Sequence, residues 1–253
     1  MEMELQNWMF TFVRASAFLL VLPVFSAANV PVLVRVALAA MLGLLVAPGL
    51  SVVMPMAGFF SSFGRLVMEA LIGLTLGFVT RLVFGAFEVG GQLISSELGL
   101  NMSSVLNPIS TAPTQAPGMM LFLLATALMF SLDLHHWLIA GFLKSYSVLP
   151  IGGAHLKEVL LEHVVKQTAN IFVVAIQMAA PIMAVSFVVT LVFSVLGRAV
   201  PQMNVFSESF ALRIMAGLIV FALTLPLIAE HMSNTLRRMP DDVLRVAQWL
   251  GTQ

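Results

Sequence analysis

The feature that most restricts how this chain folds is the length of its uncharged stretches. Residues 15–34, 36–64 and 167–197 contain no Asp, Glu, Lys or Arg. A helix that crosses a bilayer needs about 20 mainly apolar residues, and each stretch supplies them. Apolar types make up 60% of the 253 residues and charged types 9%, whereas soluble domains average about 45–50% and 25%. The sequence therefore argues against a water-soluble fold.

The apolar residues fall into six blocks that are hydrophobic on all sides. They are much longer than the strands of a membrane barrel, which have about 9–11 residues, so helices are expected. Pro31 and Pro201 lie between blocks, where helices end. We therefore predict an all-α, integral membrane-associated protein with hydrophobic segments at 8–28, 32–47, 66–84, 119–143, 171–196 and 210–228.

Prolines and charges modify this simple pattern. Pro23, Pro181 and Pro226 each remove a helix hydrogen bond, which predicts bent or broken hairpins. The polar stretches 155–167 and 239–250 are expected to form surface or interfacial helices. Charged and polar residues inside or beside apolar helix should face protein or water rather than lipid; these are Arg14, Glu69, Arg81, Asp133, His135, His136 and Arg213.

Motifs for catalysis and ligand binding point away from an enzyme. Twelve basic residues balance twelve acidic ones, so no basic excess favours nucleic acid. With no cysteine, thiolate chemistry and sulfur-bound metals are excluded. Neighbours such as His135 and His136 lie about 100° apart on a helix and should not chelate one ion together. With Asp133 they could form a metal or proton site, but a polar helix end is preferred, and we expect no catalytic, cofactor or metal site.

A stripe of small and charged residues repeats every four positions from Glu69 to Gly85. Gly73 and Gly77 would allow another helix to approach closely. The charges at its ends would serve proton coupling in a transporter or partner contacts in an assembly, and we prefer the second reading.

The segment 106–118 contains three prolines and no charge, so it cannot be a continuous helix. We predict a loop. Met102, Met119 and Met120 lie near it, and such flexible side chains either fill gaps in ordinary packing or form a deformable pore seal.

Several motifs together resemble those of the FliR family, in the family's order. They are Glu69-Ala-Leu-Ile-Gly-Leu-Thr-Leu-Gly-Phe78, Gly91-Gln-Leu-Ile-Ser95, Leu98-Gly-Leu100, Asn107-Pro108, Leu149-Pro-Ile-Gly152 and Gly197-Arg-Ala-Val-Pro-Gln-Met-Asn-Val-Phe206. This family comprises the flagellar export-gate subunit and its injectisome counterpart, the T subunit. Asn107 stands where flagellar members often have Asp, and Ser95 where Gly is frequent, which leaves both systems open.

The resemblance implies a non-enzymatic subunit of the type III secretion export gate in the bacterial inner membrane, at the flagellar basal body. One copy would join several P and Q subunits (FliP and FliQ type) in a conical helical hetero-oligomer. Residues 1–150 would resemble the P subunit and residues 151–253 the Q subunit. Further partners would be an FlhB-type switch subunit, membrane lipid and exported unfolded polypeptides, but no nucleic acid and no cofactor.

The resemblance also assigns candidate roles to residues. The uncharged loop would plug the central channel, a role filled by Leu106, Asn107, Pro108, Ile109, Ser110, Thr111, Ala112, Pro113, Thr114, Gln115, Ala116 and Pro117. Residues for helix packing and subunit contacts would be Glu69, Gly73, Gly77, Arg81, Glu88, Glu97, Arg198, Pro201 and Arg213. The alternatives are an injectisome T subunit, a secondary transporter with broken helices and a membrane assembly factor.

Overall fold

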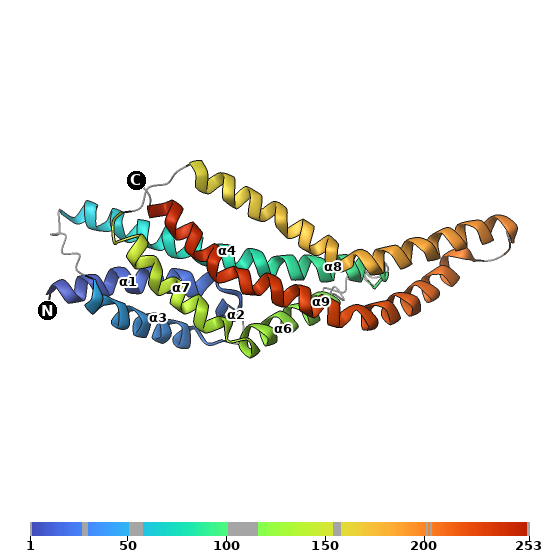
Figure 1. The fold of residues 1–253 in the computed structure, drawn as a ribbon, viewed down its shortest axis with the longest axis horizontal. Coiled ribbons are helices and arrows are strands. Elements are labelled where there is room, and N and C mark those ends of the chain that lie inside the picture. The colour runs from blue at the N-terminus through green and yellow to red at the C-terminus, as the bar shows by residue number, and fades with distance from the viewer. Residues whose placement is uncertain are drawn as a thin grey trace. The chain divides into compact units, whose positions relative to one another are not determined.

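The computed structural model describes residues 2–26, 30–50, 58–100, 116–153, 158–200, 202 and 204–251 (Figure 1). All regular structure in these ranges is helical, which confirms the predicted all-α class. The elements are α1 (Glu2–Val21), α2 (Pro23–Ser26), α3 (Val32–Val46), the 3₁₀ turn η1 (Ala47–Gly49), α4 (Gly58–Glu97), α6 (Ala116–Ser131), α7 (Leu134–Val148), α8 (Glu158–Ala199) and α9 (Val205–Gly251).

Four stretches of helix are long and apolar enough to cross a membrane: Val32–Gly49, Phe60–Glu97, Val164–Ala199 and Ser207–Gly251. A fifth span is possible if α6 and α7, which meet at an angle of 75°, count as one broken helix. The prediction of an integral membrane protein with bent segments is therefore confirmed.

The chain forms two compact units. The first contains Met1–Val83, Phe130–Thr168 and Arg237–Gln253, and the second contains Phe84–Met129 and Ala169–Leu236. In the first unit α1 packs against α3 (Figure 1). In the second, α8 and α9 run beside each other as a hairpin, and Gly217 of α9 lies close to Ile182 of α8. The long helices α4, α8 and α9 each contribute residues to both units.

Two predicted interruptions occur where the sequence places them. The helix stops at Val21 and restarts at Pro23, because proline lacks the N–H that would continue the ladder. The second interruption follows Ser131, where Asp133 adopts a left-handed conformation with φ of 55° before α7 begins. The polar helix end expected at Asp133 is therefore present.

Other expected breaks are absent from the described helices. Pro181 lies inside α8, and Pro226 and Pro240 lie inside the 47-residue α9. The stretches 158–167 and 239–250 are helical, as expected, and each is part of a longer helix, α8 and α9 respectively. A proline removes one hydrogen bond from a long ladder, which packing against other helices can offset.

Two glycines of the predicted stripe lie where α4 meets α1. A Cβ built on Gly73 would overlap the carbonyl oxygen of Arg14, and one on Gly77 would lie 2.8 Å from the carbonyl oxygen of Phe18. In both cases the backbone of α1 occupies the place where a Cβ atom would stand, so neither glycine can be replaced by a residue with a side chain without moving the helices apart. Gly85 differs, because nothing lies within 4 Å of the corresponding point.

Replacing Gly73 by Ala should therefore separate α1 from α4 and lower the thermal midpoint of unfolding. Gly85→Ala is the matched control on the same helix, and it should leave the midpoint unchanged or raise it slightly, because Ala favours a helix by about 1 kcal/mol over Gly. Circular dichroism in detergent measures both. Equal midpoints for the two variants would contradict the close contact.

Candidate functional site

Polar side chains line one face of α1. Asn7, Thr11 and Arg14 are spaced by four and three residues, so they share one side of the helix. Asn7 donates to the carbonyl of Leu50 (3.3 Å) and Thr11 to that of Gly43 (3.3 Å). This face of α1 is therefore fastened to α3 and the turn that follows it, and it carries Arg14 into the centre of the first unit.

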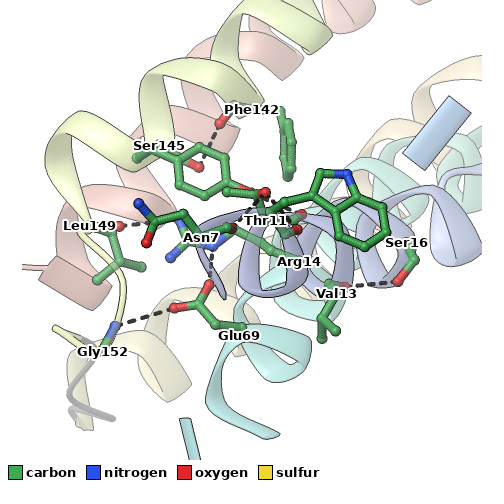
Figure 2. A network of polar contacts seen from close by, with 12 residues as sticks. Asn7, Thr11, Val13, Arg14, Ser16, Glu69, Phe142, Ser145, Leu149 and Gly152 are labelled. Carbon is green, nitrogen blue, oxygen red and sulfur yellow. Dashed lines mark hydrogen bonds and ion pairs between the residues drawn. The ribbon is translucent and has the colours of Figure 1, made fainter. Parts of the chain in front are cut away.

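Arg14 forms a fully buried ion pair with Glu69 of α4, and both side chains are 0% exposed (Figure 2). Arg14 Nε lies 2.5 Å from Glu69 Oε2, and Arg14 Nη1 donates to the carbonyl of Leu149 over 3.1 Å. The amide of Gly152 donates to Glu69 Oε1 over 3.3 Å. Both charges therefore have a counter-ion and a further hydrogen bond to the turn after α7.

Aromatic residues of α7 enclose the guanidinium group. The ring of Tyr146 lies 4.1 Å from the Arg14 carbon Cζ, which allows a cation–π interaction. Tyr146 Oη also donates to the carbonyl of Thr11 over 3.3 Å. One turn earlier on α7, Phe142 stacks on Phe18 with ring centroids 4.8 Å apart. The pair is therefore surrounded by α1, α4, α7 and the following turn.

We call Arg14, Glu69, Tyr146, Leu149 and Gly152 the buried latch. Its turn needs Gly152, whose φ of 79° is a conformation that residues with a side chain rarely adopt. Its charged groups bind one another, apart from Arg14 Nη2, which has no hydrogen-bond partner in the described structure. The latch therefore joins three elements that are distant in sequence and does not expose a charge to solvent.

Sequence reasoning found only part of this latch. It identified Arg14 and Glu69 as costly interior charges and expected Glu69 to serve helix packing and subunit contacts, but it did not pair the two side chains. Within this chain Glu69 binds Arg14 and the amide of Gly152. Tyr146 was missed. Leu149 and Gly152 carried a signal, since both belong to the turn motif Leu149-Pro-Ile-Gly152.

The other charged candidates lie nearer the surface. Arg81, Glu88 and Arg198 are exposed. In the second unit, half-buried Glu97 accepts a hydrogen bond from Ser186, and Arg213 donates to Thr190 over 3.0 Å. Pro201 lies outside the described residues.

Most of the candidate plug also lies outside the described residues, namely Leu106 to Gln115, as does Met102. Ala116 and buried Pro117 form the first turn of α6, and Met119 and Met120 are 67% and 41% exposed. A Cβ on Gly91 of α4 would overlap Gly118, so α6 begins in close contact with α4.

A pocket of about 420 Å³, lined by both apolar and polar side chains, lies between α8 and α9 in the second unit. Pro181 has no N–H to donate, so the carbonyl of Gln177 lacks its usual helical partner. His231 Nε2 is buried without a hydrogen-bond partner in the described structure. Exposed Glu230 and Asn234 also line the pocket, together with the apolar side chains of Met178, Leu227 and Ile228.

The surfaces of the two longest helices are largely apolar. Only 28% of the most apolar window of α8 and 17% of that of α9 are buried within the chain, against 56% for α4. Large exposed side chains on this hairpin include Phe172, Phe187, Val195, Met215, Leu223 and Leu227. Such a surface is stable only against lipid or another protein.

The structure brings His135 and His136 closer together than their spacing on a helix suggests, with ring centroids 4.0 Å apart. Together with Asp133 they bring one potential ligand atom each to within 4.8 Å of the others. His135 and His136 are the second and third residues of α7, where adjacent side chains can approach even though their Cβ directions differ by about 100°.

Substituting one member of the buried latch should destabilise the first unit strongly. Glu69→Gln would leave Arg14 buried without a counter-ion, at a cost of about 3–5 kcal/mol. The double variant Arg14→Met, Glu69→Gln should recover part of that loss. Glu88→Gln on the same helix is the exposed control and should change little. Thermal unfolding in detergent tests this, and additive effects of the two latch substitutions would contradict it.

Comparison with known proteins agrees with this architecture. A family described as bacterial export proteins, family 1, matches residues 5–239. The flagellar biosynthetic protein FliR of Escherichia coli strain K12 is 28% identical over 235 residues, covering 91% of this chain and 90% of its own length. FliR of Caulobacter vibrioides is 29% identical over 91% and 92%, and FliR of Bacillus subtilis strain 168 is 28% identical over 90% and 89%. The chain belongs to the FliR family of bacterial export proteins.

Proposed function

We propose that this chain is a structural, non-enzymatic subunit of the flagellar type III protein export gate in the bacterial inner membrane. The observation that carries this proposal is the contrast between the buried charges of the chain and its exposed apolar helix faces. The buried charges Arg14 and Glu69 are paired within the chain, while long faces of α8 and α9 expose apolar side chains. Such faces suit a subunit packed among neighbours and lipid.

The neighbours are P and Q subunits of the FliP and FliQ type, with one copy of this chain in a conical helical hetero-oligomer, and an FlhB-type switch subunit. Exposed charges on apolar helices support this, because Arg81, Glu88 and Arg198 would be costly in lipid and favourable beside partner charges. The pocket beside Glu230 is a further surface that a partner side chain can fill.

The segment Leu106–Pro117 is proposed as the channel plug. Support comes from both of its ends. At the end of α4, the amides of Gly99 and Leu100 donate to the carbonyls of Ser96 and Ser95. At the start of α6, Gly118 lies against Gly91 of α4. The described residues on either side, Leu100 and Ala116, thus follow and begin two helices that pack against each other. The uncharged composition of the segment suits a closure that blocks ions and moves aside for a polypeptide. Met119 and Met120, exposed at the start of α6, would seal around it together with Met102.

Two other functions are less well supported. A secondary transporter would need a titratable group free to exchange protons, whereas Glu69 is held by Arg14 and by the amide of Gly152. An injectisome subunit is less well supported than a flagellar one, because each relative described above is named as a flagellar biosynthetic protein.

Deleting residues 109–114 should make the membrane permeable to ions while the complex still assembles, because the proposed plug closes a pore without holding the fold. The control replaces the same six residues by Gly and Ser at constant length, which retains a neutral closure. Ion leakage in cells and recovery of the intact complex are measured together. An unchanged ion permeability after the deletion would contradict the plug.

Co-expression of the tagged chain with FliP-type and FliQ-type subunits should yield a discrete hetero-oligomer that contains one copy of this chain. Native mass spectrometry of the purified complex measures the stoichiometry. Recovery of the chain alone, or as a homo-oligomer, would contradict the proposed assembly.

A further inference from the structure

The bend between α6 and α7 carries a group of side chains that the proposed export function does not use. Asp133 Oδ1 lies 3.5 Å from His136 Nδ1, and these side chains are 74% and 70% exposed. The ring of His135 lies 4.0 Å from that of His136. All three residues belong to the first unit, so their mutual geometry is defined within one compact body.

The spacing of these groups is close to what a metal ion requires. One ligand atom from each residue lies within 4.8 Å of the others. Ligands of a tetrahedral zinc ion, bound at about 2.0–2.1 Å, are about 3.4 Å apart. The Asp133–His136 pair is already at 3.5 Å, and exposed side chains change rotamer easily. Rotation of the exposed side chains of Asp133 and His136 is the movement by which these atoms would reach coordinating positions around one ion.

The chemistry of the donors points the same way. Two imidazoles and one carboxylate are ligands that zinc and related divalent transition metals accept. His135 Nδ1 is buried and has no hydrogen-bond partner in the part of the chain that the structure describes. Phe130 lies against the same ring, with centroids 5.1 Å apart, which restricts how His135 can turn. An ion pair between Asp133 and His136 alone would leave the buried Nδ1 of His135 without a partner.

We propose that Asp133, His135 and His136 bind one divalent transition-metal ion, with water completing its coordination. The metal would tie the left-handed residue before α7 to the first turn of that helix. Asp133 has no side-chain hydrogen bond that caps α7, so the coordinated ion would supply the restraint that a cap normally provides. Its role is to fix the direction in which the chain enters α7.

The test is a zinc titration of the full-length chain, purified in detergent through a tag that contains no histidine. The chain has no cysteine and five histidines, so thiolates do not compete for the metal. Calorimetry should give one zinc ion per chain, and bound zinc should raise the thermal midpoint, because a ligand that binds only the folded state stabilises it.

Two variants remove one ligand each, and a third provides the control. His136→Asn and Asp133→Asn should each weaken zinc binding by about tenfold or more, since even outer-shell partners contribute roughly 10–100-fold. Asn tolerates the left-handed conformation of Asp133, so this variant keeps the backbone if His136→Asn misfolds. His231→Asn in α9 should bind zinc as the unmodified chain does. Absence of saturable binding near one equivalent, or an equal loss in His231→Asn, would overturn the proposal.

Discussion

The ion pair between Arg14 and Glu69 is the interaction on which the first unit depends. Two charges are removed completely from solvent, which is tolerable only when each is neutralised and hydrogen-bonded. The structure meets this condition by bringing α1, α4 and the turn after α7 to one point. The close contact of Gly73 with the backbone of Arg14 is part of the same arrangement, because it sets how near α4 comes to α1.

The distribution of charged and apolar side chains differs from that of a typical soluble protein. The centre of the first unit contains a charged latch, while the hairpin of α8 and α9 presents large apolar side chains outward. Internal pairing makes the unit self-contained, and the apolar exterior makes the chain dependent on lipid or neighbours. Both properties agree with membership of a family of bacterial export proteins.

The sequence was sufficient to predict the helical class, the break before Pro23 and the end at Asp133, because all three follow from local chemistry. It could not predict that α9 continues through Pro226 and Pro240, since tertiary packing decides whether a missing hydrogen bond ends a helix. Nor could it pair Arg14 with Glu69. Partners 55 residues apart meet only when helices have a particular register, and local patterns do not contain that information.

The completeness of the Arg14–Glu69 pairing also constrains how this chain can evolve. A change at either position alone passes through a form with one unmatched charge in the core. Loss of both charges together is far less harmful, because apolar residues of similar volume can replace a buried pair. The two positions should therefore vary as a unit among related proteins, with paired substitutions and few single ones, and Tyr146 should change with them because its ring covers the guanidinium group.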